Sequence, residues 1–197
     1  MSEIIVETVY FEEPGPQNTD RALSLARDRA KALGINTLVI ATTSGAAAVR
    51  ATEILPNFKI VAVTHSTGFR ESGVQELTDV HRSTLEQAGV QILTCQHAFG
   101  GVNRAIRKKL GTYQVDEVIA YTLRLFGQGM KVVAEITLMA ADAGLVEPGE
   151  PVVVAAGTGH GTDTVVVLGP TNAQTFFDLE FMEIVCLPSP RHPAHIS

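Results

Sequence analysis

The feature that most limits the fold of this chain is a repeated alternation of short apolar runs with longer segments of helical periodicity. Apolar runs of strand length lie at residues 37–41 (TLVIA), 59–63 (KIVAV) and 90–94 (VQILT). A loop rich in Gly, Ser, Thr or His follows each run, and the segments between the runs carry apolar residues at helical spacing. This order of strand, loop and helix predicts right-handed crossovers in a parallel sheet that helices cover on both faces.

The rest of the chain continues the same pattern. Further strands are expected at residues 4–11, 151–156, 164–168 and 181–187. A first helix is expected from Asn18 to Leu33, and the following helices at residues 47–55, 74–88, 102–110, 115–126 and 130–143. The segment 130–143 is apolar almost all round, which is typical of a buried helix.

The size of the chain favours one domain. Its 197 residues, 45% of them hydrophobic and 18% charged, are enough for a substantial core. We find no internal repeat and no stretch rich enough in Pro, Gly or Ser to act as a linker. We therefore expect a single domain over residues 1–188 and a loose C-terminal tail over residues 189–197.

Charge and composition argue against several partners and compartments. The net charge of −6, the absence of Trp and an aromatic content of 6% disfavour a nucleic-acid binder. The longest apolar segment is interrupted by Glu135 and Asp142 and is too short to span a bilayer. The opening residues do not resemble a signal peptide, and Cys95 and Cys186 do not form a disulfide framework. We expect a cytoplasmic protein without nucleic-acid or membrane partners.

Polar loops are expected to gather at one edge of the sheet. In open α/β sheets, ligands bind beyond the carboxyl ends of the strands. This rule selects four loops, all rich in Gly, Thr, Ser or His: Thr42–Gly45, Thr64–Phe69, Gln96–Gly101 and Gly157–Asp163.

The first of these loops joins a predicted strand to a predicted helix. Its sequence, Thr42-Thr43-Ser44-Gly45, brings hydroxyl groups and free backbone N–H groups to the start of the helix. Such a helix N-terminus is a ready site for a phosphate. A plain helix cap by Ser44, with a glycine that eases the turn, explains the same residues equally well.

The last loop is the segment of the chain that is densest in glycine. It fails as a dinucleotide-binding GxGxxG motif, because Thr162 stands at the third glycine position and a strand follows in place of a helix. One interpretation is that the loop lets backbone approach a ligand, with Thr158 and Thr162 as donors. The alternative is a hairpin turn between antiparallel strands, and the length of the loop favours ligand contact.

Several other polar residues have both a structural and a functional explanation. His65, His97 and His160 each follow a predicted strand, but their spacing is not that of metal ligands, so no metal site is expected. Lys131 and Glu135 suggest a surface i,i+4 pair on a stripe shared with Asp142, with a partly buried Glu135 facing the cleft as the alternative. The basic residues Arg104, Arg107, Lys108 and Lys109 suggest a solvated helix face.

Two motifs carry a resemblance to a known family. The segment Thr42–Ala48 and the run PNFKIVAVT at 56–64 resemble the T-x-S-G-x-x-A and P-x-x-x-I-x-x-V-T pattern of the pyruvate kinase C-terminal domain. The chain is similar as a whole to stand-alone proteins of that kind. The similar segments are PGPQNT (14–19), THSTGF (64–69), QHAFGG (96–101), LFGQGMKVVAEITLMAADAG (125–144), GTGHGTDTVVV (157–167) and FFDLEFMEIVCLP (176–188).

The resemblance implies a fold and a ligand. It implies a three-layer α/β/α sandwich with a mostly parallel sheet whose last strands are antiparallel. It also implies FMN in the cleft, and no pyruvate kinase catalysis, because the catalytic barrel of that enzyme has no counterpart here. Flavin-dependent oxidoreductase activity and a ligand-free oligomeric interaction module are the alternatives, and a homo-oligomer remains open.

The residues expected to bind the ligand follow from the strand-end rule and from this resemblance. The phosphate is expected at Thr42, Thr43, Ser44 and Gly45. Thr64, Thr67, Gly68 and Phe69 are expected to line one wall, with Phe69 against the flavin ring and His97 closing the site. The opposite rim is expected to consist of Gly157, Thr158, Gly159, Gly161 and Thr162. No catalytic residue is assigned.

Overall fold

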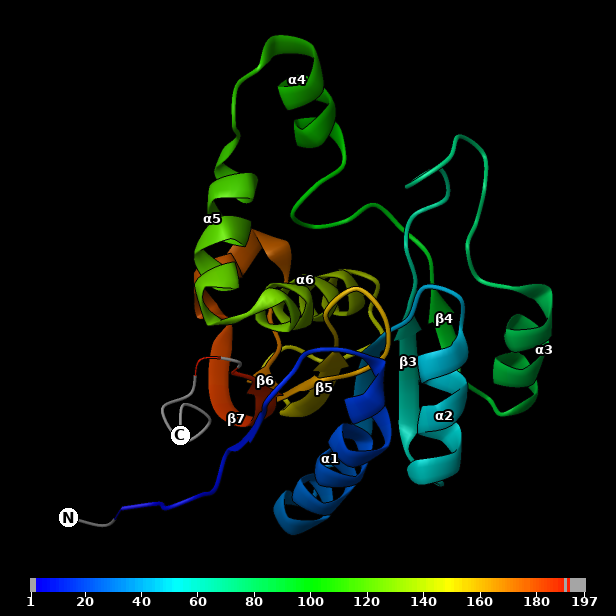
Figure 1. The fold of residues 1–197 in the computed structure, drawn as a ribbon, viewed down its shortest axis with the longest axis vertical. Helices are drawn as coiled ribbons and strands as arrows, with labels where there is room; N and C mark the ends of the chain where they lie inside the picture. Colours follow the sequence, from blue (N-terminus) through cyan, green and yellow to red (C-terminus); the bar gives the residue numbers. More distant parts are fainter. Residues whose placement is uncertain (1–2, 190, 192–197) are drawn as a thin grey trace.

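One mixed sheet of seven strands forms the centre of the molecule (Figure 1). The computed structural model describes residues 3–189 and 191. The strand order is β1-β7-β6-β5-β2-β3-β4. The bounds are β1 Val9–Phe11, β2 Thr37–Ala41, β3 Lys59–Val63, β4 Gln91–Leu93, β5 Val152–Ala156, β6 Thr164–Gly169 and β7 Glu180–Pro188. Only β6 runs antiparallel to its neighbours, β5 and β7, and the other adjacent strands are parallel.

Helices cover both faces of this sheet. On one face lie α1 (Thr19–Leu33), α2 (Ala46–Ile54) and α3 (Asp79–Gln87), and on the other lies α6 (Gln128–Asp142). Alternate strand residues divide between the two cores: Leu38 and Ile40 of β2 face the α1 side, whereas Val39 packs with α6. The expected three-layer α/β arrangement, with antiparallel pairing among the last strands, is therefore confirmed.

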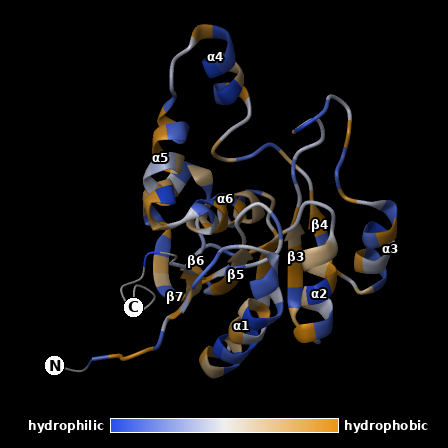
Figure 2. Ribbon diagram, in the orientation of Figure 1, coloured by the Kyte–Doolittle hydropathy of each residue, from blue (hydrophilic) through white to orange (hydrophobic). Residues whose placement is uncertain are grey.

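Two further helices, α4 (Val102–Leu110) and α5 (Val115–Leu123), extend beyond the sheet at the top of Figure 1. α5 packs on α6, whereas α4 contributes no buried residue. Short 3₁₀ segments complete the fold: η1 Pro16–Asn18, η2 Arg124–Phe126 and η3 Ala173–Asp178. Hydrophobic residues concentrate in the strands, and α4 is largely hydrophilic (Figure 2). No helix in the described part of the chain has the length and apolar character needed to cross a membrane.

Two elements begin five residues later than the sequence-based expectation. β1 covers residues 9–11 in place of 4–11, because only these three residues pair with β7. α3 begins at Asp79, five residues later than expected, because the Thr78 side chain caps it by accepting from His81 N–H (3.3 Å). The tail predicted at 189–197 lies mostly outside the described residues, although Ser189 N–H donates to Phe11 (2.9 Å).

Gly129 marks a close approach between α6 and β6. A Cβ at this position would lie 2.1 Å from Thr164 Oγ1 and 2.4 Å from Thr164 Cβ. Replacing a helical glycine by alanine usually raises stability, by up to about 1 kcal/mol. Here Gly129→Ala is expected to lower the free energy of unfolding by about 1–3 kcal/mol, because the new methyl group overpacks this contact. Urea denaturation measures the change, and a stabilised variant would contradict the close approach.

Candidate functional site

A cleft of about 620 Å³ opens at the carboxyl ends of β2, β3 and β5. Its volume lies within the roughly 300–1,000 Å³ typical of small-ligand sites. Nine of the residues expected from the sequence line it: Thr42, Thr43, Ser44, Thr64, Phe69, His97, Gly157, Gly159 and Gly161. The strand-end rule therefore located the cleft in this sheet.

The other expected residues lie beside the cleft without lining it. They are Gly45, Thr67, Gly68, Thr158 and Thr162. Gly45 turns toward α3, since a Cβ on it would lie 2.4 Å from the Cβ of His81. Its φ of 102° also favours glycine, so its role in this turn is conformational.

The start of α2 forms one end of the cleft. No side chain caps this helix, so Ser44 is not its cap, and the carbonyl of Ser44 is occupied by Thr78 N–H (3.2 Å) and His81 Nδ1 (2.8 Å). Ala46 and Ala47, in the first turn, line the cleft. The hydroxyl of Thr42, a residue 6% exposed, is buried without a hydrogen-bond partner. Unsatisfied donors thus converge at a helix N-terminus, where an anion is favoured.

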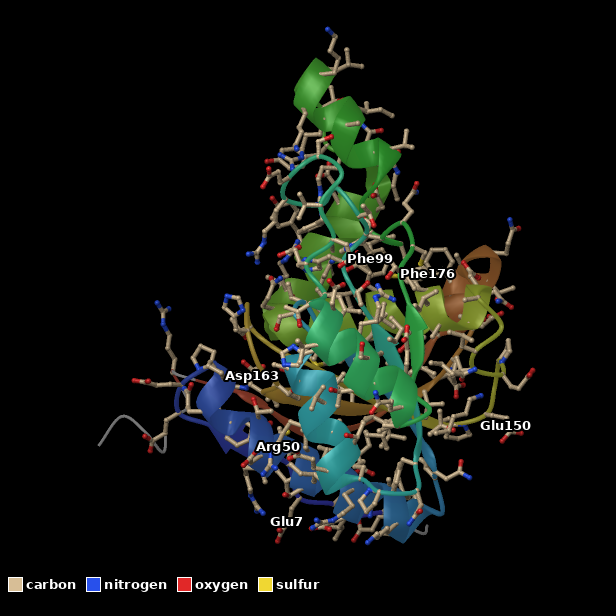
Figure 3. The ribbon with its side chains drawn as sticks, turned by 90° about the vertical axis from the view of Figure 1, so that its right-hand side faces the viewer. Glu7, Arg50, Phe99, Glu150, Asp163 and Phe176 are labelled. Atoms are coloured by element: carbon tan, nitrogen blue, oxygen red, sulfur yellow. The ribbon has the colours of Figure 1, made fainter. Side chains whose placement is uncertain are left out.

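The glycine-rich loop 157–163 is both a hairpin turn and a wall of the cleft. It joins the antiparallel strands β5 and β6, so the two interpretations that the sequence left open are compatible. Asp163, which is fully buried, holds the loop in place (Figure 3). It accepts from the N–H groups of Gly15 (3.0 Å) and Thr158 (3.1 Å) and from the hydroxyl of Thr164 (2.8 Å). Thr162 N–H donates to Thr19 Oγ1 (3.0 Å), which ties the loop to the start of α1.

Three rings form an aromatic wall of the cleft. Phe69 stacks on His97 with centroids 4.7 Å apart, and His65 lies 4.2 Å from Phe69. His65 Nδ1 contacts Glu76 Oε2 (2.6 Å), and burial lowers the pKa of His65 despite this carboxylate. His97 Nε2 accepts from Ser66 N–H (3.3 Å), which leaves its Nδ1 facing α6. The sequence predicted that Phe69 and His97 belong to the site, but it did not predict that their rings stack on each other.

A buried charged group lies where α6 meets this wall. Lys131 and Glu135 are 4% and 3% exposed, and Lys131 Nζ donates to Glu135 Oε2. His97 Nδ1 lies 3.6 Å from the same oxygen, and Phe99 N–H donates to Glu135 Oε1 (3.0 Å). Burial alone would raise the pKa of Glu135, but His97 and Lys131 outweigh it and hold the pKa at about 2.

This group corrects one expectation from the sequence. The surface pair expected for Lys131 and Glu135 is wrong, and the alternative of a buried Glu135 facing the cleft is confirmed. The signal was present in the sequence, because two charged residues interrupted an otherwise apolar helix. Asp142 does not share this environment: it is exposed and accepts from Asn172 Nδ2 and Ala173 N–H.

Four arginines line the cleft, and sequence reasoning assigned none of them to the site. Arg50, which is labelled in Figure 3, pairs with Asp20 (2.6 Å), and Arg70 pairs with Glu76 (3.1 Å). Arg104 and Arg124 come from α4 and η2. Arg104 was expected on a solvated helix face, but its guanidinium lies over the ring of Phe69 at 5.0 Å. The sequence around Arg104 contains no pattern that predicts this contact between α4 and the loop after β3.

Within residues 3–189 and 191, we find no group of three or more His, Cys, Asp or Glu residues arranged to hold a metal ion. His65 and His97 belong to the aromatic wall, and His160, on the loop 157–163, also lines the cleft. In the described part of the chain, the polar groups that line the cleft are backbone amides, hydroxyls, imidazoles, cationic side chains, the carboxamide of Gln128 and the carboxylates of Asp20 and Glu135.

The chain is similar to a known protein family in sequence and to solved structures in fold. The family model described as pyruvate kinase, alpha/beta domain, matches residues 20–168. Two solved pyruvate kinases from Cryptosporidium parvum are similar to the chain, with 17% and 15% sequence identity and TM-scores of 0.41 and 0.40. The matches cover 80% and 81% of this chain, but 24% and 23% of those enzymes. The chain thus spans about a quarter of the length of the enzymes it matches.

Proposed function

Because the chain belongs to the pyruvate kinase alpha/beta domain family, we propose that it is a ligand-binding member of that family, with a phosphorylated small molecule in the cleft. FMN is the first candidate ligand. The proposal includes no pyruvate kinase catalysis. The observation that carries it is the uncapped start of α2 beside the buried, unpartnered hydroxyl of Thr42.

The residues of the cleft fit the parts of FMN. Its phosphate dianion matches the N–H groups at the start of α2, where the helix dipole adds to their attraction. The aromatic wall of His65, Phe69 and His97 suits a flat ring system. Gly157, Gly159 and Gly161 also line the cleft, where the absence of side chains lets a ligand approach their backbone. Bound FMN would supply redox chemistry, whereas the residues named here would hold and orient it.

FMN titration with riboflavin as a matched ligand tests the proposal. Flavin fluorescence and thermal shift follow binding, since a ligand of the native state raises apparent stability by mass action. Riboflavin lacks only the phosphate, so we expect it to bind at least roughly tenfold more weakly, as loss of a charge-assisted contact predicts. Equal affinity for the two compounds would show that the site does not recognise the phosphate group. If neither compound binds, the flavin is excluded as the ligand.

Thr42→Val separates ligand binding from folding. The buried hydroxyl of Thr42 has no partner in the free protein, so its replacement by an isosteric methyl group should leave stability unchanged or raise it. FMN affinity should fall by roughly fivefold, the effect of one lost hydrogen bond. Ser83→Ala, at an exposed position of α3, is the control for both measurements. A destabilised Thr42→Val protein with unchanged affinity would contradict the assignment.

A further inference from the structure

The end of the cleft formed by α4, η2 and α6 carries positive charge that the protein does not neutralise. Lys131, Arg104 and Arg124 all line this end. Among the described residues, neither arginine forms a salt bridge within 4.0 Å of a carboxylate. This contrasts with Arg50 and Arg70, which line the same cleft and are paired with Asp20 and Glu76. In a protein of net charge −6, two unpaired arginines in one cleft need an explanation.

Neutral groups hold the two guanidinium groups in place. Arg104 lies over the ring of Phe69, with Cζ 5.0 Å from the centroid. Arg124 donates through Nε to Gln128 Oε1 (2.7 Å), and its Cζ lies 5.3 Å from the centroid of Tyr121. These contacts orient the side chains without cancelling their charge. The guanidinium N–H groups not used in these contacts remain as donors for a planar or tetrahedral oxyanion.

Glu135 cannot supply the missing negative charge, because its two oxygens are already used. One accepts from Lys131 and faces His97, and the other accepts from Phe99 N–H. Lys131 is itself almost fully buried, and this burial lowers its pKa; Glu135 opposes the shift, and the charges of Arg124 and Arg104 add to it. The three cations therefore repel one another across a short region that contains a single carboxylate.

We propose that Arg104, Arg124 and Lys131 form a second oxyanion subsite, distinct from the start of α2, that binds a phosphate or carboxylate group. This oxyanion is either the far end of the molecule held at α2 or a second anionic molecule bound beside it. The inference rests on the proposed role of the cleft as a ligand site, but it does not require the ligand to be FMN. Binding of an oxyanion here compensates the excess positive charge, which explains why the arginines lack protein partners.

Inorganic phosphate is the probe, titrated into the full chain at constant ionic strength because screening weakens such contacts. NMR chemical shifts of the arginine side chains report the site. Arg104→Gln and Arg124→Gln are each expected to weaken phosphate binding at this end by about tenfold or more, as loss of a charged hydrogen bond predicts. Lys108→Gln, on the exposed side of α4, is the matched control and should change the affinity by less than about twofold. Urea denaturation checks that every variant remains folded.

The same titration in the presence of saturating FMN identifies the source of the oxyanion. If phosphate still binds and still depends on Arg104 and Arg124, a second anionic molecule occupies the subsite. If FMN displaces phosphate from the arginines, the far end of the first ligand occupies it. If FMN does not bind at all but the arginine variants weaken phosphate, the flavin proposal fails and the subsite stands. Phosphate affinity that is unchanged in both arginine variants would overturn the inference.

Discussion

Replacing Glu135 by glutamine is expected to lower the free energy of unfolding by about 3–5 kcal/mol, the usual cost of breaking one partner of a buried ion pair. The change leaves Lys131 charged, 4% exposed and beside two arginines, with no carboxylate to balance it. It also weakens the acceptor for Phe99 N–H. Urea denaturation at neutral pH measures the loss. A variant that unfolds at the wild-type urea concentration would show that the pair contributes little.

A double replacement distinguishes an unpaired charge from a general packing defect. Lys131→Met alone leaves the Glu135 carboxylate buried, although His97 and Phe99 N–H still contact it. The double variant Lys131→Met/Glu135→Leu removes both charges, and a well-packed apolar pair of this kind is often neutral or stabilising. We therefore expect it to recover most of the stability lost in Glu135→Gln. A double variant that is as unstable as the sum of the single variants would indicate lost packing in place of lost charge.

The pH dependence follows from the same carboxylate. The pKa of Glu135 is about 2 in the folded protein, whereas its ordinary value is 4.5. Folding therefore depresses the pKa of this carboxyl group, and the ionised form stabilises the folded protein. Such a group contributes stability that is fully present above about pH 4.5 and is lost as pH falls toward 2. Glu135→Gln should therefore show a flatter loss of stability than the wild type between these two pH values. Parallel slopes in urea denaturation across that window would contradict the assigned pKa.

Replacing Asp163 by alanine is the second large effect that we expect, a loss of about 2–5 kcal/mol in the free energy of unfolding. The side chain is fully buried and accepts three hydrogen bonds. Its removal leaves the N–H groups of Gly15 and Thr158 without their acceptor, and each buried unsatisfied group costs roughly 1–3 kcal/mol. Urea denaturation gives the total effect, and hydrogen exchange of the Gly15 and Thr158 amides shows whether the loop opens locally.

Asp163→Asn is the matched control, because the geometry lets asparagine replace all three bonds. Both backbone donors point to Oδ2, and within the part of the chain that the structure describes Oδ1 accepts a hydrogen bond from the hydroxyl of Thr164 alone. An asparagine with its carbonyl oxygen at the Oδ2 position keeps the two backbone bonds, and its amide can donate to the Thr164 hydroxyl. We expect a loss below about 1 kcal/mol. A loss equal to that of Asp163→Ala would show that the negative charge, rather than the hydrogen bonds, holds the loop.

Elements whose residues are apolar on every side could be predicted from the sequence with close boundaries. β2 and β3 occupy the expected residues, because turn residues bound these apolar runs. The start of α3 could not be placed, since Val74 and Leu77 continue the helical spacing although the segment before Thr78 is a loop. Leu77, in that segment, is buried because it packs in the same core as α1 and α2, and not because it belongs to a helix.

The residues of the candidate site likewise fall into those that the sequence could predict and those that it could not. Residues in the loops that follow strands, such as Ser44 after β2 and His97 after β4, could be assigned from the strand-end rule alone. Arg104 and Arg124 could not, because their position depends on how α4 and η2 fold back over the cleft. Local sequence determines the helical state of these segments, but only tertiary packing determines which of their side chains reach the strands.

The parallel pairing of β1 with β7 has a consequence for how the protein is made. Val9 lies opposite Cys186 and Phe11 opposite Pro188, so β1 has its only strand partner almost at the other end of the described chain. During synthesis on the ribosome, β2, β3 and β4 can assemble early, whereas β1 must wait until β7 has emerged. Contacts of such long separation form slowly. The nascent protein therefore carries an unpaired β1, and the edge strand that begins the sheet is among the last to be incorporated.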